Sequence, residues 1–158
     1  MRAVGPKRED LDALHEEVRD RLRSADQLFT TGRRRLVELL AEVGRPVTIP
    51  QLIAADSGVA LSSAYRNMAV LEQVGVVARI VSSGEHARFE LTEAVMGHHH
   101  HHLICSTCGR VDDFTVPDDV EQAIEDALAE VATDSDFLAS SHRLDLVGTC
   151  VGCASTSG

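Results

Sequence analysis

The sequence predicts an α+β chain in which an N-terminal winged helix-turn-helix domain is followed by a small α/β domain. Three observations predict this class. Helical apolar patterns fill most of the first 75 residues, two short strand patterns follow them, and a strand, helix and strand pattern then lies between two C-x-x-C pairs. We place the winged domain at residues 1–92, a hinge at 93–97, the second domain at 98–153 and a disordered polar tail at 154–158.

The first three helices are predicted from apolar residues at helical spacing and from their stop signals. The first covers residues 8 to about 27, and its apolar stripe consists of Leu11, Leu14, Val18 and Leu22. His15 lies in this helix, and we interpret it as an exposed or packed residue rather than a ligand. The second helix covers residues 33–43, where Gly44 ends it, and a short third helix covers 49–55.

The next helix and the wing complete the first domain. The helix is predicted over residues 64–74, capped by Ser62 or Ser63 and ended by the glycine that follows it. Two strands, 76–81 and 87–91, come next, with a Ser-Ser-Gly-Glu turn between them. This order of elements predicts a helix-turn-helix with a two-stranded wing.

The start of that helix carries side chains suited to DNA. In a helix-turn-helix the first residues of the second helix meet base edges in the major groove, and Tyr65 and Arg66 stand there. A guanidinium suits guanine or phosphate, and an aromatic ring can contact bases or backbone. The alternative is a winged module for protein contact, with Tyr65 half-buried at the helix start. The predicted DNA-contacting set is Tyr65, Arg66, Ser62, Ser63, Asn67 and Arg33.

The net charge of -10 is unevenly distributed along the chain. Residues 1–84 carry 12 Lys and Arg against 11 Asp and Glu, whereas residues 85–158 carry 3 against 14. A near-neutral N-terminal part can still present arginines to phosphates, because local charge decides the contact. No apolar run is long enough to span a membrane and no signal-peptide pattern opens the chain, so we expect a cytoplasmic protein without membrane contact.

The C-terminal part is predicted as a strand at 110–116, a helix from Pro117 to about residue 132 and a strand at 143–147. Such a small acidic domain needs a metal ion or a second subunit for stability. Its four cysteines form two C-x-x-C pairs, a pattern that indicates metal rather than disulfides in a reducing cytosol. Four thiolates suit structural zinc, whereas a thioredoxin-like redox pair would need one such motif at a helix start. The cysteines are Cys105, Cys108, Cys150 and Cys153.

Five consecutive histidines, residues 98–102, look like a purification handle but lie in the middle of the chain. In an extended backbone the side chains at 98, 100 and 102 share one face, and those at 99 and 101 share the other. One run therefore supplies two sites, each of which needs further ligands. The candidate partners are His86, Glu90, Asp112, Asp113, Glu121 and His142. A solvated surface role is accepted for Asp118, Asp119, Glu125 and Asp126.

The ordered motifs resemble the ferric uptake regulator (Fur) family of metal-dependent bacterial repressors. The matching segments are 31–35, 63–66, 88–91, 99–105, 108–114 and 142–153. The resemblance implies a homodimer in which each subunit has an N-terminal winged helix and a C-terminal dimerisation domain. It implies structural zinc on Cys105, Cys108, Cys150 and Cys153, a regulatory site of His100, His102, Glu90 and Asp113 at the hinge, and a further site of His99, His101, Glu121 and His142. It leaves His98 without a role.

Several departures from the family pattern bear on the metal. His101 replaces an aspartate and makes its site richer in nitrogen, as in some zinc-sensing members. Arg45 stands in the segment where many members have a hinge-site histidine, and His86 is our candidate replacement. The cysteine that zinc sensors often carry near the end of the wing is missing. Asp113, where iron sensors mostly have glutamate, is similar to the peroxide-sensing branch.

We therefore expect a metal-responsive repressor, and not an enzyme, that binds palindromic operator DNA when Fe²⁺, Zn²⁺ or Mn²⁺ occupies the regulatory site. Iron is the first choice for the signal, a zinc-uptake regulator the second and a peroxide-sensing regulator the third. The sequence lacks the H-x-E signature of zinc deaminases and the H-E-x-x-H of metalloproteases. A metal buffer or chaperone is the other alternative, and it would not need the Tyr65-Arg66 helix.

Overall fold

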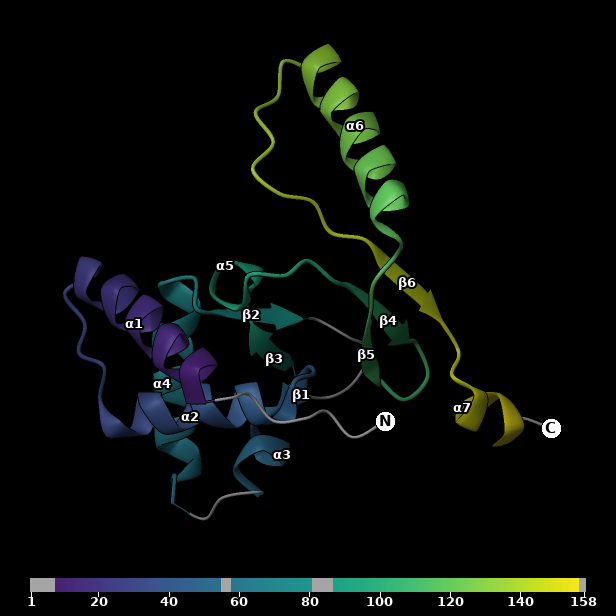
Figure 1. The fold of residues 1–158 in the computed structure, drawn as a ribbon. Helices are drawn as coiled ribbons and strands as arrows, with labels where there is room; N and C mark the ends of the chain where they lie inside the picture. The colour runs from purple at the N-terminus through teal and green to yellow at the C-terminus, as the bar shows by residue number, and fades with distance from the viewer. Residues whose placement is uncertain (1–7, 55–57, 81–86, 157–158) are drawn as a thin grey trace.

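The computed structural model describes residues 8–54, 58–80 and 87–156, which contain two three-stranded sheets (Figure 1). The N-terminal elements are α1 (Arg8–Ser24), α2 (Thr31–Val43), β1 (Val47–Thr48), α3 (Ile49–Ala54), α4 (Leu61–Gln73), β2 (Val77–Ile80) and β3 (Arg88–Leu91). The C-terminal elements are α5 (Glu93–Met96), β4 (His101–Cys105), β5 (Val111–Phe114), α6 (Asp118–Asp134), β6 (Asp145–Gly148) and α7 (Val151–Thr156).

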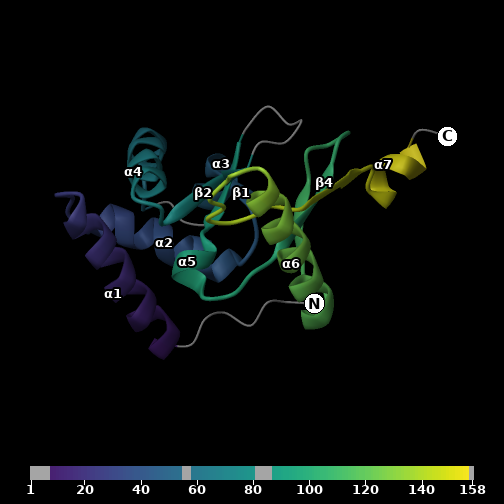
Figure 2. The same ribbon diagram turned by 90° about the horizontal axis from the view of Figure 1, so that it is seen from above.

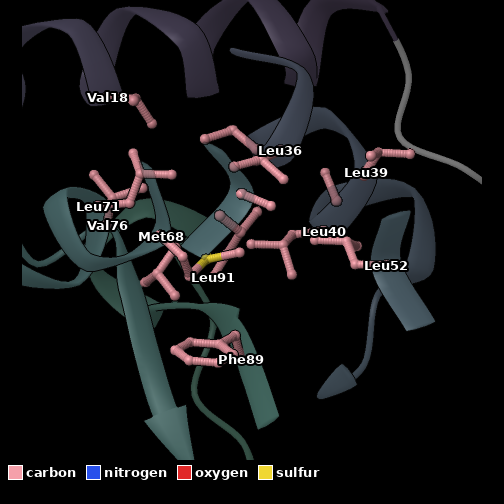
Figure 3. Packing of buried hydrophobic residues seen from close by; sticks show 14 of the residues in the cluster. Val18, Leu36, Leu39, Leu40, Leu52, Met68, Leu71, Val76, Phe89 and Leu91 are labelled. Atoms are coloured by element: carbon pink, nitrogen blue, oxygen red, sulfur yellow. The ribbon is translucent and has the colours of Figure 1, made fainter. Parts of the chain in front are cut away.

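The N-terminal elements share one apolar core. The first sheet has the antiparallel order β1-β3-β2, with Phe89 opposite both Val47 and Arg79. Helices α1 to α4 pack their apolar faces together and against this sheet (Figure 3). Leu36 of α2 and Met68 of α4 are fully buried there. The arrangement confirms the predicted helical stripes and the winged-helix order of elements.

The helix ends agree with the sequence in part. Helix α2 begins two residues earlier than expected because the Thr30 hydroxyl caps it, accepting the Arg33 backbone N–H at 3.4 Å. Gly44 ends it with φ 59°, as predicted. The predicted serine cap of α4 is wrong. The helix begins at Leu61, which places both Ser62 and Ser63 inside its first turn, and no side chain caps it.

The second sheet has the order β5-β4-β6, in which β4 pairs antiparallel with β5 and parallel with β6. A small cluster of Ile80, Ile104 and Val111 joins it to the tip of β2. Helix α6 contains no buried residue, and all four residues of β6 are exposed. Figures 1 and 2 show α6 standing away from the helices of the first core.

Several boundaries of the second half differ from the predictions. The predicted hinge, 93–97, contains the short helix α5, and Pro117 precedes α6 as its N-cap rather than being its first residue. The disordered tail is wrong for residues 154–156, which belong to α7. The strand that contains the histidines begins at His101, so residues 98–100 lead into it. The wing turn and His86 lie outside the described residues.

Candidate metal centres

Strand β4 and the residues before it distribute the histidines to two sides. The rings of His100 and His102 lie 5.2 Å apart, and those of His99 and His101 lie 4.7 Å apart, each pair at nearly right angles. His102 lies opposite Asp113 of β5 in the strand register. The alternation expected from an extended backbone is therefore present in the geometry, and each pair meets carboxylates from other elements.

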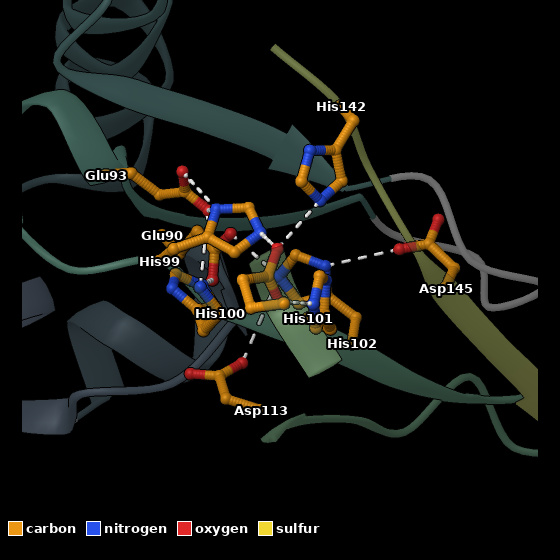
Figure 4. Close-up of polar contacts among 10 residues, drawn as sticks. Glu90, Glu93, His99, His100, His101, His102, Asp113, His142 and Asp145 are labelled. Atoms are coloured by element: carbon orange, nitrogen blue, oxygen red, sulfur yellow. Dashed lines mark hydrogen bonds and ion pairs between the residues drawn. The ribbon is translucent and has the colours of Figure 1, made fainter. Parts of the chain in front are cut away.

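The first cluster, called the interdomain cluster here, consists of Glu90, His100, His102 and Asp113. Glu90 projects from β3 of the first sheet and is only 8% exposed. Its Oε2 lies 3.1 Å from His100 Nε2, and its Oε1 lies 2.8 Å from His102 Nε2. Asp113 Oδ1 is 4.0 Å from the same nitrogen of His102. The two sheets thus meet at four ligand groups whose donor atoms lie within 4.8 Å of one another (Figure 4).

The interdomain cluster has coupled electrostatics. Burial acts to raise the pKa of Glu90, but the hydrogen bonds from His100 and His102 outweigh it and hold that pKa below its usual value. The hydrogen bond to Glu90 raises the pKa of His100 against the effect of burial. Burial and the negative charge of Glu90 raise the pKa of Asp113. Protons on the histidines would balance the carboxylates here, and a divalent cation could replace those protons.

The second cluster consists of His99, His101, Glu121 and His142. Its three imidazoles surround the Glu121 carboxylate of α6. His99 Nε2 and His142 Nε2 lie 3.2 and 3.1 Å from its Oε1, and His101 Nε2 lies 2.7 Å from its Oε2. His99 Nε2, His142 Nε2 and Glu121 Oε1 are buried without a hydrogen-bond partner of good geometry. Three nitrogens and one carboxylate that converge in this way fit a divalent cation, which would satisfy the buried atoms.

The third cluster is formed by the two C-x-x-C motifs. Cys105, Cys108, Cys150 and Cys153 are not joined by disulfide bonds, and their sulfurs lie within 4.8 Å of one another. Backbone N–H groups of Cys150 and Cys108 lower the pKa of Cys105 to about 6, whereas the neighbouring thiols raise the pKa of Cys153 to about 12. Four sulfurs at this spacing fit a closed tetrahedral zinc site.

His98 belongs to none of the three clusters, although it lies beside the interdomain cluster. Its exposed ring lies 5.8 Å from the His100 ring, and its Nδ1 lies 3.2 Å from the Met96 carbonyl oxygen. The residue also lines a small cavity with Arg45 and Glu90. The cavity places Arg45 beside the interdomain cluster. Arg45 lies in the segment where the family resemblance leads us to expect a further histidine ligand.

Two acidic residues beside the clusters were missed by the sequence analysis. Glu93 of α5 contacts His99, and Asp145 of β6 contacts His102. Glu93 fell in the predicted hinge. Asp145 could have been found only from the parallel pairing of β4 and β6, in which it lies opposite His102.

The predicted DNA-contacting residues lie at the start of α4 and in α2. Ser62, Tyr65 and Arg66 are exposed, and the exposed fraction of Tyr65 is 45%. Asn67 is only partly exposed and faces α2 at Gly32. The set is completed by Ser63, which is partly exposed, and by Arg33, whose guanidinium donates to the Leu28 carbonyl oxygen and to Gln27. Arg33 thus also closes the loop before α2.

The comparisons with known proteins agree with this geometry. The model of the ferric uptake regulator family matches residues 25–147. The ferric uptake regulation protein of Legionella pneumophila is 29% identical over 142 residues, which are 87% of this chain and 98% of that protein. The peroxide-responsive repressor PerR of Staphylococcus epidermidis is 29% identical over 151 residues, which are 92% of this chain and 93% of that protein.

The fold agrees as well. The solved structure of the Helicobacter pylori ferric uptake regulator Fur superposes with a TM-score of 0.70 at 23% identity, covering 91% of this chain and 93% of that one. Among the described residues, no helix is long and apolar enough to cross a membrane. The family match spans more than half of the sequence, and the chain therefore belongs to the ferric uptake regulator family, whose members are metal-responsive transcription regulators and not enzymes.

Proposed function

We propose that this chain is a transcriptional repressor that binds a palindromic operator as a homodimer when a divalent cation, iron by first choice, occupies the interdomain cluster. One observation carries the proposal. Glu90 belongs to the wing sheet, yet both of its carboxylate oxygens face histidines that precede or lie in β4 of the other sheet. Occupancy of this cluster therefore bears directly on how the winged-helix part sits against the C-terminal part.

The ligand residues act by fixing this angle. His100 and His102 hold Glu90 at the end of β3, and β3 pairs with β2 in the wing that follows α4. A bound divalent cation supplies the positive charge that keeps two carboxylates and two neutral imidazoles together. The arrangement seen here is then favoured over more open ones, and the start of α4 is held at one orientation for DNA.

The homodimer is proposed to form through the C-terminal part, with the domain boundary in segment 93–97. The 17 residues of α6 include no buried side chain, and β6 is exposed along its length. Exposed apolar area of this extent typically marks an interface. The exposed apolar residues include Val120, Leu128, Val131, Phe137, Leu138, Leu144, Leu146 and Val147. Two winged helices per dimer would then read two half-sites.

The structural zinc ion is proposed to bind Cys105, Cys108, Cys150 and Cys153. A zinc ion on these cysteines would tie the end of β4 to Cys150, which lies between β6 and α7, and to Cys153 in α7. The exposed sheet has little apolar core of its own, so ligation would contribute directly to its folding.

Two related signals are second candidates. The PerR relative is as similar as the iron regulator, which supports peroxide sensing through an iron-loaded interdomain cluster. The three-imidazole second cluster supports zinc sensing, because nitrogen-rich sites suit Zn²⁺.

The experiment is a gel-shift titration of the zinc-purified chain with Fe²⁺, Mn²⁺ and Zn²⁺ under anaerobic conditions, followed by EDTA and by hydrogen peroxide. We expect operator binding to require added cation and to be reversed by EDTA. Operator affinity that EDTA leaves unchanged contradicts metal dependence. Loss of binding with peroxide only in the iron-loaded chain selects peroxide sensing, and a response to Zn²⁺ alone selects zinc sensing.

A further inference from the structure

Two carboxylates that lie outside the histidine clusters each hold the second ring nitrogen of a cluster histidine. His99 Nδ1 lies 2.7 Å from the Glu93 carboxylate, and His102 Nδ1 lies 3.3 Å from Asp145 Oδ1 (Figure 4). Each ring therefore has a carboxylate at Nδ1 and directs Nε2 into its own cluster.

This arrangement suits metal ligation. A histidine that donates Nδ1–H to a carboxylate is held in the tautomer that offers the Nε2 lone pair, and the donated bond makes that nitrogen more basic. For His99 the lone pair then faces the Glu121 carboxylate, and for His102 it faces Glu90. Glu93 and Asp145 thus fix ring orientation without being ligands.

Each of these acids contacts a histidine of one cluster but lies close in the sequence to a member of the other cluster. Glu93 holds a histidine of the second cluster but follows Glu90, a member of the interdomain cluster, by three residues. Asp145 holds a histidine of the interdomain cluster but follows His142, a member of the second cluster, by three residues. Each acid therefore sits on the segment that carries a member of the opposite cluster.

Glu93 also contacts both clusters directly. Besides His99, its Oε1 accepts the backbone N–H of His100 at 3.3 Å. One carboxylate at the start of α5 thus orders a ring of the second cluster and the backbone of the interdomain cluster. A movement of the His99 ring therefore shifts the Glu93 carboxylate relative to the His100 backbone, and a movement of that backbone shifts it relative to the ring.

We propose that Glu93 and Asp145 are positioning residues that couple the two clusters, so that a divalent cation in one raises the affinity of the other. The inference rests on the proposed function in taking the interdomain cluster as a metal site, and it takes the second cluster as a metal site as well. Filling the second cluster orders His99, and hence Glu93 and the His100 backbone, before the interdomain cluster binds. By thermodynamic linkage, a cation in the interdomain cluster raises the cation affinity of the second cluster by the same factor.

The test is calorimetric titration of the DNA-free, full-length chain, with zinc in the cysteine site, using Co²⁺ as the probe. Glu121→Ala disables the second cluster, so the affinity of the interdomain cluster is measured with and without its neighbour. We expect at least a 5-fold higher affinity when the second cluster is intact. In a Glu93→Gln background, the affinities with and without the second cluster should have a ratio near one. The amide has only one oxygen, so it cannot accept hydrogen bonds from both His99 Nδ1 and the His100 backbone N–H as the two carboxylate oxygens do.

Variants at Glu93 and a control at Glu16 distinguish a role of Glu93 in positioning His99 from a general effect on folding. Glu93→Gln should weaken the second cluster by roughly 10-fold and Glu93→Ala by more, whereas Glu16→Gln, an exposed change of the same charge on α1, should have no effect. Equal ratios in the wild-type and Glu93→Gln backgrounds, or equal affinities in Glu93→Gln and Glu16→Gln, would overturn the coupling. Loss of metal-dependent operator binding without loss of coupling would instead contradict the proposed function alone.

Discussion

Substitution of His100 by alanine tests the interdomain cluster most directly. The variant removes one of two nitrogen donors from a set of four groups and leaves Glu90, His102 and Asp113 in place. The ring is largely buried, with its side chain 9% exposed, and its Nε2 lies 3.1 Å from Glu90.

The size of the effect follows from the ligand count. Loss of a residue that only supports a ligand costs about 10- to 100-fold in metal affinity, so loss of a direct ligand should cost at least about 100-fold. This corresponds to roughly 2.7 kcal/mol. The cation concentration that gives half-maximal operator binding should rise by the same factor, while the affinity at saturating cation changes much less.

The assay is fluorescence anisotropy of a labelled operator titrated with Mn²⁺ at fixed protein concentration. His98→Ala is the matched control, because it removes a nearby histidine that belongs to no cluster. The Nδ1 of His98 lies within hydrogen-bond distance of the Met96 carbonyl oxygen. It should leave the midpoint unchanged. Equal shifts in the two variants, or no shift in His100→Ala, would refute the assignment of His100 as a ligand.

Three further predictions concern the zinc site, the DNA surface and α1. Cys108→Ser should remove the bound zinc and unfold the C-terminal sheet, since structural zinc sites supply on the order of 10 kcal/mol; metal analysis with circular dichroism checks this, and a folded, zinc-free variant would contradict it. Arg66→Ala should weaken operator binding by about 1–3 kcal/mol in gel shifts, whereas exposed Arg23→Ala on α1 should not; equal losses would remove Arg66 from the interface. Burial, aided by Arg34, lowers the pKa of His15, so the folded chain binds the proton less well than the unfolded chain. The contribution of His15 to stability should therefore be full above its unfolded pKa near 6.5 and decline as pH falls below it. Thermal unfolding between pH 7.5 and 5.5 should show a smaller loss of stability, or a larger gain, in His15→Gln than in the wild-type chain, and an identical pH dependence would exclude His15 as a source.

The features that could be predicted from the sequence depend on local geometry. Alternation along an extended backbone separates His99 from His100 whatever the rest of the chain does, and the structure gathers each set with its expected carboxylates. The C-x-x-C spacing brings each pair of sulfurs together in the same way. The apolar stripes of α1 and α2 likewise followed from helical periodicity.

The features that could not be predicted depend on tertiary contacts. His15 is buried, with Phe29 and Arg34 of α2 against its ring, which the pattern of α1 alone does not indicate. Asp145 meets His102 only through the parallel register of β4 and β6. Glu93 reaches His99 because α5 turns the chain back, whereas the sequence suggested only a connector. Local signals predicted the members of the clusters, whereas the acids beside them could be found only from the fold.

The run of five histidines is one residue longer than the two clusters need, so a shift of the strand by one residue would still place imidazoles in both. In most strands the loss of one residue exchanges the two faces and replaces every ligand. Here, deletion of the exposed Leu103 would move each histidine one place toward Cys105, and the positions now held by residues 99–102 would be filled by residues 98–101. All four positions would still carry imidazoles, and Cys105 would not move. His98, which belongs to no cluster, would then supply the fourth imidazole.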